Sequence, residues 1–491
     1  MTGGGCSVWP CDFRAYPDQP AAGGFVLSSA RADLAHAPAA AGRPLMRINH
    51  QARRVELSVG ELAGFRNVPA SAPQAPGRWR AEVGQQWHRT AAERARQSHP
   101  EARFEQSLTA DWMHGDWIFS LRGRIDQILP RESGPLLREV KSICSPLPAP
   151  REELVARYPD YFAQIAAYLC LSRVLPEWRG KSLQAELMLI EIETGAVQSL
   201  PLTDAEESLF PRQLDRLLPY LDDRREARRR FSARQLKPAF PSLREGQAQA
   251  LAELAAAQLQ SPVVLFEAPT GFGKTGIVLQ HSLELMQQGQ FERCIYLTSK
   301  ATGQLETMRQ LQEMAGGALR YLQMRNRDEH RIDSLNHRCS GDGRCDESDD
   351  ALGERTDVFL PGLFDEGTFN VEIARREGAR LGLCPYSLTR ACLPYADVWL
   401  GDYNYIFAPG SRRVFTDSQD FDPARTCLII DEAHNLPARV CDALGIRIPA
   451  AELGFAAEAM REAGAPRRLT GQLRALAEAI DRWPAERTLP A

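Results

Sequence analysis

A glycine-rich turn between an apolar run and a helix-forming run carries the side chains best suited to chemistry. The apolar run 263–266 leads through Glu267 into Ala268, Pro269, Thr270, Gly271, Phe272, Gly273, Lys274 and Thr275. Glycines in such a turn let backbone N–H groups converge on phosphate oxygens, and the helix expected over 276–287 adds the positive end of its dipole. Lys274 can then reach the β- and γ-phosphates, and the Thr275 hydroxyl can hold Mg²⁺. The turn predicts an ATP site, although Ala268 replaces the first glycine of the usual pattern.

A second apolar run ends in two acids. Residues 427–430 precede Asp431, Glu432, Ala433 and His434. Asp431 is placed to hold Mg²⁺ through water, and Glu432 is placed to orient and deprotonate the attacking water. An apolar strand followed by two acids can also be an ordinary strand end, but the phosphate loop in the same chain favours ATP hydrolysis.

Charged residues also alternate on two expected strands in the N-terminal half. The first strand, 117–129, carries Asp126, and the strand after the turn at 131–135 carries Glu139 and Lys141. A spacing of two places Glu139 and Lys141 on one face of a strand. Two carboxylates can bind Mg²⁺ or Mn²⁺, which activates water and polarises a phosphodiester, and a lysine can stabilise the developing charge. Alone the pattern is weak, because charged residues alternate in any half-exposed hairpin.

Two expected helices flank this hairpin. One contains Gly84 to His88, and the other contains residues 161–168. Within the second helix, Gln164 and Tyr168 are four residues apart and therefore share one face.

The order of the expected elements divides the 491 residues into more than one domain, because a chain of this length exceeds a single hydrophobic core. Alternating strands and helices in the C-terminal half are typical of an α/β fold with a parallel sheet. The expected parts are an irregular segment 1–42, a domain 43–221, an Arg-rich linker 222–237, a domain 238–445 with a Cys-bearing insertion at about 321–395, and a helical segment 446–491.

Composition limits the class of protein and its partners. The net charge of −4 gives no basic field over the whole molecule, so nucleic-acid contacts must use local clusters such as 224–230, a run that is as readily a solvated helix face. We expect no membrane partner, because the sequence lacks an apolar run of about 18 residues. Since no secretory signal is visible, a cytoplasmic site is expected, where the 11 cysteines would be thiols or metal ligands.

The two ATP-site motifs together resemble those of superfamily-two helicases. Three further segments resemble the XPD/DinG family: Phe240 to Gln247, Thr298 to Lys300, and Cys384-Pro385-Tyr386 followed by Asp402 to Tyr405. The resemblance covers about 238–445 and implies a RecA-like ATP-binding domain. It also implies that Gln247 contacts the adenine and that Thr298 to Lys300 meet the DNA backbone.

Members of that family hold a [4Fe–4S] cluster with four thiolates in the corresponding insertion. The resemblance implies as ligands Cys339, Cys345 and Cys384. No cysteine stands at 325–331, where the first ligand is expected. Candidates for the fourth ligand are Cys392, His330 and His337. Cys392 lies about 12 Å from Cys384 along a straight helix, which is long for one cluster. A zinc site and an insertion without metal are the alternatives.

The ordered set of motifs from 80 to 195 resembles the RecB-type branch of the PD-(D/E)xK nucleases. The resemblance implies these active-site residues: the metal ligands His88, Asp126 and Glu139, the catalytic Lys141, and the supporting Gln164 and Tyr168. A glutamate at the second acidic position is a variation that the family name allows. A lone helical histidine is more often a core or surface residue. The other motifs follow His88 in the order that this family has, which favours His88 as a metal ligand.

Together the resemblances predict an ATP-dependent DNA helicase with a fused Mg²⁺- or Mn²⁺-dependent nuclease, acting on single strands or junctions in DNA repair or defence. Such helicases hold ATP between two RecA-like domains, whereas the segment 446–491 resembles the start of the family's helical arch. We therefore expect either a longer protein or a second chain to supply the other motor domain, and little DNA-stimulated ATPase from these residues alone. The alternative function is a DNA-binding metal-cluster subunit without nuclease or motor activity.

Overall fold

The computed structural model describes most of the chain. The described residues are 26–29, 46–66, 78–332, 352, 355, 358–418, 420–445 and 449–482. Within these ranges, no helix combines the length and the apolar character that crossing a membrane would require.

The N-terminal part is built on a mixed sheet with the strand order β2-β3-β5-β6-β7-β8, and β4 pairs with β5. Its strands are β2 (Arg47–Asn49), β3 (Arg54–Ser58), β4 (Arg103–His114), β5 (Trp117–Leu129), β6 (Leu136–Ile143), β7 (Gln184–Glu191) and β8 (Val197–Pro201). The β3–β5 and β6–β7 pairs are parallel, and the other pairs are antiparallel. Trp117, Phe119 and Leu121 are buried, which is the period-two pattern of a strand with one covered face. The predicted hairpin of β5 and β6 is confirmed.

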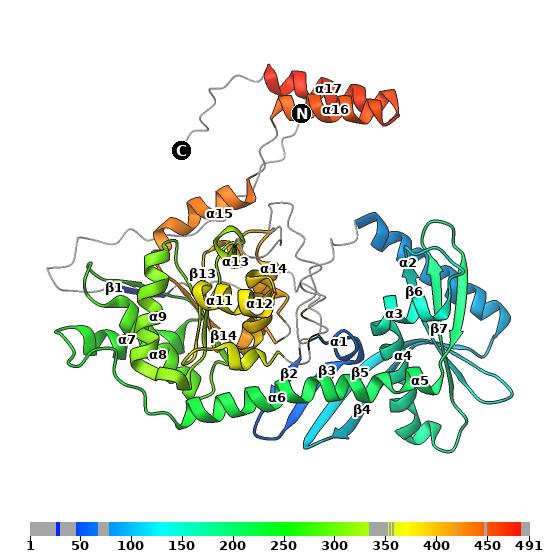
Figure 1. The fold of residues 1–491 in the computed structure, drawn as a ribbon, viewed down its shortest axis with the longest axis horizontal. Coiled ribbons are helices and arrows are strands. Elements are labelled where there is room, and N and C mark those ends of the chain that lie inside the picture. Colours follow the sequence, from blue (N-terminus) through cyan, green and yellow to red (C-terminus); the bar gives the residue numbers. More distant parts are fainter. Residues whose placement is uncertain are drawn as a thin grey trace.

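Helix α4 (Pro159–Val174) packs on β6 and β7 and belongs to a hydrophobic core that continues into the C-terminal part. Its residues Phe162, Ile165 and Leu169 are at most 1% exposed, because they follow the three- to four-residue spacing of one helical face. The other helices here are α1 (Val59–Ala63), α2 (Arg78–Ser98), α3 (Arg151–Arg157) and α5 (Asp204–Glu207). Figure 1 shows α2, α3 and α4 gathered around β6 and β7.

The C-terminal part contains a parallel sheet with the order β12-β11-β13-β10-β14. Its strands are β10 (Arg293–Leu297), β11 (Tyr321–Gln323), β12 (Thr368–Phe369), β13 (Val398–Gly401) and β14 (Thr426–Ile430). Its helices are α7 (Gln247–Gln260), α8 (Lys274–Gln287), α9 (Ala301–Ala315), α11 (Val371–Leu381), α12 (Pro385–Cys392), α13 (Asn404–Phe407) and α14 (Arg413–Thr416). Leu279, Leu283 and Leu311 pack from α8 and α9 into a core with Tyr296 of β10. The expected α/β architecture with a parallel sheet is therefore confirmed.

Two features of this part differ from the prediction. The predicted insertion 321–395 is not separate from the sheet, because β11 and β12 pair within it; these strands are too short for a periodic sequence signal. The strand before the phosphate loop, β9 (Val264–Glu267), lies outside the five-stranded ladder and pairs, among the described residues, with β1 (Val26–Ser29).

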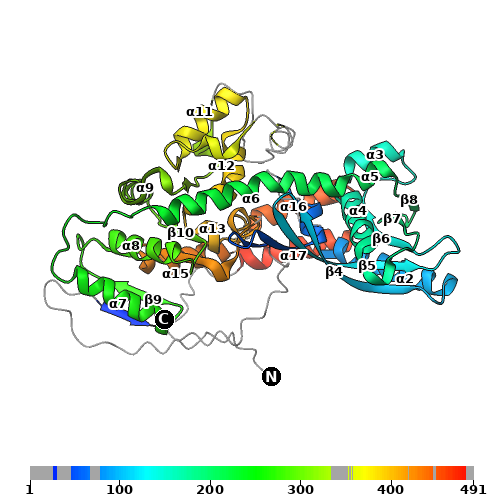
Figure 2. The same cartoon turned by 90° about the horizontal axis from the view of Figure 1, so that it is seen from below.

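A single helix joins the two parts. Helix α6 (Leu209–Ala233) includes most of the segment predicted as a linker, and Figures 1 and 2 show it running along both. Its first half meets the N-terminal part, where Gln213 donates to the carbonyl oxygens of Leu62 and Ala63 at 3.0 and 2.7 Å. Its second half meets the C-terminal part through the buried Arg224–Asp397 ion pair of 2.9 Å. The Arg-rich run within α6 resembles a solvated helix face, and for this reason the sequence predicted a linker over 222–237.

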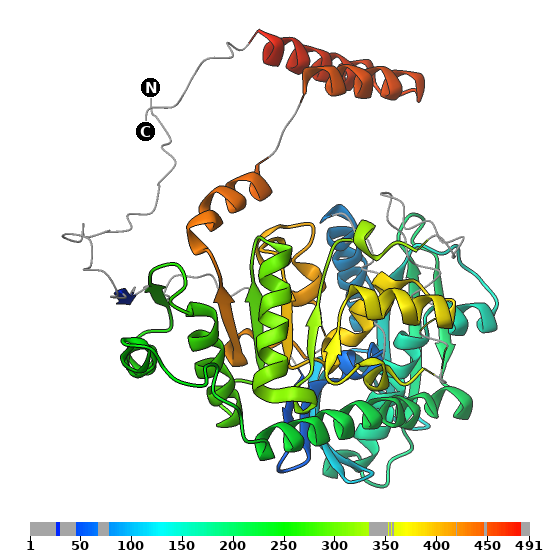
Figure 3. The same ribbon diagram turned by 60° about the vertical axis from the view of Figure 1, so that its left-hand side comes forward.

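The last described elements are helical, as expected. Helix α15 (Leu436–Leu444) follows the second ATP motif, Asp431 to His434, and α16 (Ala450–Glu462) pairs with α17 (Arg467–Asp481). Figure 3 shows α16 and α17 side by side, standing away from both sheets.

Candidate functional sites

The phosphate loop has the geometry that its glycines predict. Gly271 and Gly273 have φ values of +80° and +91°, a backbone region that favours glycine. A Cβ added at Gly273 would lie 2.6 Å from the Phe240 ring, so a side chain there would also collide. Helix α8 begins directly at Lys274, which directs its N-terminal N–H groups toward the loop. The strand–turn–helix arrangement is therefore confirmed.

Carbonyl oxygens of the loop accept hydrogen bonds from the side chains of Lys274 and Gln247. The Lys274 ammonium donates to the carbonyl oxygens of Ala268 and Pro269 at 2.7 and 3.3 Å. The Gln247 side chain, 1% exposed, donates to the Phe272 carbonyl at 2.6 Å and accepts from the backbone N–H of Arg244 at 2.7 Å. Gln247 therefore supports the loop directly, and its predicted contact with adenine stays a prediction.

The two acids of the second ATP motif follow β14. The backbone N–H of Asp431 donates to the Leu297 carbonyl at 2.9 Å, which fixes Asp431 at the carboxyl end of the sheet. Glu432 has φ of +52°, and its side chain is 46% exposed. The Tyr403 hydroxyl donates to the carbonyl oxygens of both acids.

Tyr296 connects the two ATP motifs, although the sequence did not identify it. Burial raises the pKa of Tyr296, as does the nearby Asp431 carboxylate, whereas a hydrogen bond with Thr275 lowers it. The hydroxyl therefore lies close to both residues predicted to share Mg²⁺. Only its position inside β10, an ordinary apolar strand, could have been read from the sequence.

The structure brings together the predicted nuclease residues of β5, β6 and α4. Lys141 Nζ lies 2.9 Å from Glu139 Oε1, and the Gln164 amide donates to the same oxygen at 2.7 Å. Asp126 Oδ2 accepts from the backbone N–H of Val140 at 2.8 Å. This bond ties Asp126 on β5 to β6, the strand that carries Glu139. The Tyr168 hydroxyl lies 3.3 Å from the Gln164 amide. Residues spread over 43 positions thus form one site.

Two local features make this convergence possible. Tyr168 approaches β5 so closely that a Cβ at Gly123 would lie 2.5 Å from its ring, so glycine is needed there. Helix α2 is held beside β6 and β7 because the Trp87 indole donates to the Ile192 carbonyl at 3.1 Å. That contact places the neighbouring His88 near the site.

The charges in the site are strongly coupled. Burial raises the pKa of Glu139 to about 7, because Lys141 only partly offsets burial and Asp126 adds repulsion. Burial opposes the charge of Lys141, but Glu139 raises the pKa of this lysine above its ordinary value. Burial lowers the pKa of His88, against the opposing effect of Asp126. His88 is therefore held toward its neutral form, which is the form that binds metals.

One atom of the site fits a cation. Glu139 Oε2 is buried without a hydrogen-bond partner, and the side chain is only 3% exposed. An unpaired buried carboxylate oxygen is costly, and a divalent cation would satisfy it. Still, over the ranges that the structure describes, no three His, Cys, Asp or Glu side chains already converge as a metal-ligand group. Lys141 occupies the other oxygen of Glu139, so ligation would require these side chains to adjust.

The predicted cluster ligands lie only partly within the described residues. Cys339, Cys345 and His337 fall outside them. Cys384 is 1% exposed at the start of α12, and Cys392 is fully buried at its end, 3.9 Å from the Leu360 carbonyl oxygen. The two ring nitrogens of His330 lie 2.8 Å from the Asn326 carbonyl oxygen and 3.0 Å from the Thr389 hydroxyl. His330 is thus a fully paired core residue, which leaves it no nitrogen for a metal.

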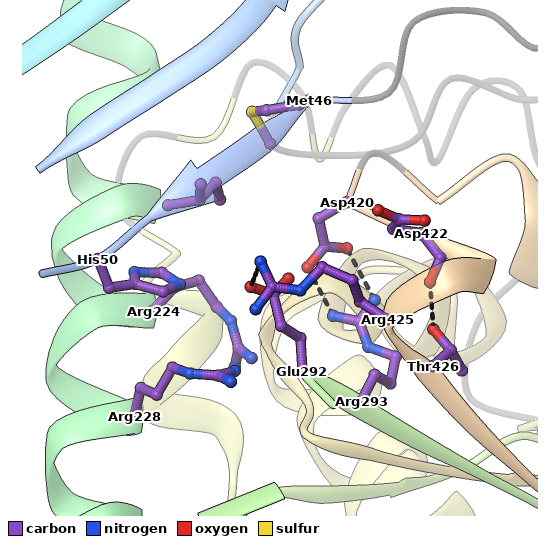
Figure 4. Close-up of a pocket in the computed structure, with 11 residues that line it drawn as sticks. Met46, His50, Arg224, Arg228, Glu292, Arg293, Asp420, Asp422, Arg425 and Thr426 are labelled. Carbon is purple, nitrogen blue, oxygen red and sulfur yellow. Dashed lines mark hydrogen bonds and ion pairs between the residues drawn. The ribbon is translucent and has the colours of Figure 1, made fainter. Parts of the chain in front are cut away.

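A charged cavity marks the junction of β2, α6 and the parallel sheet (Figure 4). Its lining residues are Met46, Ile48, His50, Arg224, Arg228, Glu292, Arg293, Asp420, Asp422, Arg425 and Thr426. Arg293 pairs with Asp420 at 2.6 Å, and Arg425 pairs with Glu292 at 2.9 Å. Burial, followed by Arg224 and Arg228, lowers the pKa of His50 from 6.5 to about 3.

Replacing His50 with glutamine is expected to reduce the acid sensitivity of the protein. Between pH 6.5 and 3 the unfolded state binds a proton at His50 that the folded state excludes, so stability falls as pH drops through this window. We expect the wild type to lose about 2 kcal/mol more than His50→Gln between pH 7 and pH 5. Urea unfolding at the two pH values measures this, with His99→Gln as the matched control. Equal pH dependence of wild type and His50→Gln would contradict it.

Comparison with known proteins matches the C-terminal part to a helicase family. Residues 285–453 match the DEAD_2 family model. "Regulator of telomere elongation helicase 1 homolog" of Drosophila erecta is 29% identical over 98 residues, which are 20% of this chain and 10% of that protein. "General transcription and DNA repair factor IIH helicase subunit XPD" of Dictyostelium discoideum is 30% identical over 83 residues, 17% of this chain and 10% of that protein.

The matched segment thus spans about a tenth of the length of these curated relatives. A solved structure, "XPD_Helicase", has 20% sequence identity and a TM-score of 0.34, and covers 48% of this chain and 40% of its own. The sequence matches support the predicted resemblance, and the chain therefore contains a DEAD_2 segment similar to XPD-like superfamily-two helicases.

Proposed function

We propose that the chain combines the ATP-binding half of a DNA helicase motor with a metal-dependent nuclease. The DEAD_2 match supports the motor, together with the phosphate loop and the position of Tyr296 close to both Thr275 and Asp431. DNA is the proposed substrate, because both relatives are named as helicases and one as a DNA repair factor. A role in DNA repair or defence belongs to this proposal.

The observation that carries the nuclease proposal is the Glu139 carboxylate: its Oε1 is held by Lys141 and Gln164, and its buried Oε2 has no hydrogen-bond partner. Asp126 is tied to the same strand through the backbone N–H of Val140. A structural hairpin gains nothing from such an oxygen, since leaving it unpaired destabilises the fold. In a site that binds a cation, the same oxygen can serve as a ligand of the ion.

His88, Asp126 and Glu139 would hold the Mg²⁺ or Mn²⁺ ion, which when bound polarises the phosphodiester and lowers the pKa of water. Gln164 fixes the Glu139 carboxylate by its amide hydrogen bond. Lys141 would place its ammonium beside the scissile phosphate and neutralise the charge that develops there. Tyr168 supports Gln164 and also accepts from the backbone N–H of Arg124 at 3.2 Å, which ties α4 to β5.

The proposal also includes a [4Fe–4S] cluster with Cys384, Cys339 and Cys345 among its ligands. Its support is the buried position of Cys384 within the DEAD_2 segment. Iron, acid-labile sulfide and zinc contents of anaerobically purified protein separate an iron–sulfur cluster from a zinc site.

Cleavage of labelled single-stranded DNA tests the nuclease. Wild type is expected to cut with Mn²⁺ or Mg²⁺, and Asp126→Ala is expected to lose cleavage, because one of the three proposed ligands of the ion is removed. Asp116→Ala is the control, since Asp116 is 77% exposed and pairs with Arg53 away from the site.

A wild type that folds correctly but cuts with neither metal would remove the nuclease from the proposal. That outcome would favour a DNA-binding subunit without nuclease activity.

A further inference from the structure

One arginine of the charged cavity has no acidic partner. The half-buried Arg228 of α6 donates to the Phe291 carbonyl oxygen at 3.2 Å, and no carboxylate of the described residues forms an ion pair with it. Burial lowers the pKa of Arg228; Glu292 opposes this effect, but repulsion from Arg224 adds to it. A partly desolvated guanidinium without a counter-charge is costly.

The acids that line the same cavity are engaged with other groups. The Asp420 carboxylate accepts from Arg293 at 2.9 and 2.6 Å. Glu292 pairs with Arg425 at 2.9 Å. Asp422 accepts from a backbone N–H two residues further along the chain, also at 2.9 Å. The lining therefore has no acid left to neutralise the remaining arginine.

Two further nitrogen atoms of the lining residues are buried without a hydrogen-bond partner. They are Nδ1 of His50 and Nε of Arg293, and the Arg293 side chain belongs to a residue that is only 3% exposed. The arginine Nε–H can only donate, and a neutral histidine donates from Nδ1 in one of its two tautomers. Buried donors without an acceptor destabilise a fold, so these two nitrogens and the unpaired guanidinium all favour an acceptor that carries negative charge.

The size and the walls of the cavity limit what can occupy it. Its volume is about 20 Å³, which is room for one ligand of the size of a water molecule. Met46 and Ile48 of β2 are 6% and 9% exposed and cover one side with apolar atoms, which strengthens the attraction between charges inside. Figure 4 shows Arg224 and Arg228 extending from α6 on one side of this space and Arg425 extending from the other.

We propose that this cavity binds one monovalent anion of the size of chloride, held by Arg228 with donors from His50 and Arg293. A water molecule would leave the charge of Arg228 uncompensated, whereas an anion neutralises it. A bound anion would join α6 to β2 and to β10. The residues of the ATP motifs and of the candidate nuclease site do not line this cavity, so the inference is independent of the proposed function.

Thermal unfolding of the full chain in two sodium salts of equal ionic strength tests the proposal. Chloride fits the cavity, whereas isethionate is too large for it. Because an anion that binds only the folded state stabilises that state, we expect the midpoint of wild type to be about 2 °C or more higher in chloride than in isethionate at about 150 mM salt.

Arg228→Gln should lose this difference between the salts. Glutamine removes the charge but can still donate to the Phe291 carbonyl. In isethionate the variant should unfold at or above the midpoint of wild type, because the charge that it removes has no ion-pair partner. Arg229→Gln is the matched control, since the Arg229 side chain is 69% exposed on the same helix, and it should keep the difference. Lys274→Ala should keep it too, because the phosphate loop is not the proposed anion site.

Bromide locates the ion directly. Crystals of wild type grown in sodium bromide should show an anomalous peak inside the cavity, beside Arg228. Equal midpoints of wild type in the two salts would overturn the proposal, as would a difference that Arg228→Gln retains or that Lys274→Ala loses. A bromide map without a peak in the cavity would overturn it as well, whatever the midpoints show.

Discussion

Replacing Arg224 with alanine is expected to lower the free energy of unfolding by about 3–5 kcal/mol. The Arg224–Asp397 ion pair joins α6 to the parallel sheet, and its side chains are 5% and 7% exposed. Arg224 also donates to the Tyr395 carbonyl at 2.8 Å. The truncation leaves the Asp397 carboxylate buried with a lost partner, and an uncompensated buried charge costs far more than a surface pair. Urea unfolding at pH 7 measures the loss.

Arg229→Ala is the control on the same helix. Arg229 pairs with Glu226 on an exposed face, and its side chain is 69% exposed. Its truncation should change the free energy of unfolding by less than about 0.5 kcal/mol, since exposed ion pairs contribute little. Similar effects of the two substitutions would show that α6 is not held by its buried charges.

Replacing Lys274 with alanine is expected to weaken Mg-ATP binding about 100-fold. The lysine ammonium bonds to two carbonyl oxygens of its own loop, which holds it at the helix N-terminus where phosphates would bind. Exchange of these carbonyls for charged phosphate oxygens contributes roughly 2–3 kcal/mol, which is lost on truncation. Calorimetric titration with ATP and Mg²⁺ measures the dissociation constant.

Lys237→Ala is the matched control, because Lys237 is an exposed lysine outside the loop. Its affinity for Mg-ATP should equal that of wild type. Unchanged affinity in Lys274→Ala would mean that the loop does not bind nucleotide phosphates as proposed.

The junction formed by α6 bears on how the two candidate sites can work together. Asp223 and Arg320 form a second buried ion pair at 2.6 Å beside Arg224 and Asp397. On the other side, the Trp117 indole donates to Asp222 at 2.8 Å. Three consecutive residues of one helix thus bind both parts, so α6 packs on both sheets instead of acting as an unattached linker between them.

The sequence determined the features that depend on neighbouring residues. Gly271, Gly273 and Lys274 follow each other in a turn whose conformation only glycine favours, so the phosphate loop could be predicted directly. Glu139 and Lys141 share a strand face because strands repeat every two residues. These patterns need no knowledge of the rest of the fold.

Tertiary structure decided the features that depend on distant residues. Arg224 meets Asp397 across 173 positions, and neither residue carries a local signal of its partner. Tyr296 meets Thr275 and Asp431 only because β10 pairs with β14 and packs against α8. Sequence spacing fixes which side chains share a face, whereas packing between faces fixes which charges become buried, paired or left without a partner.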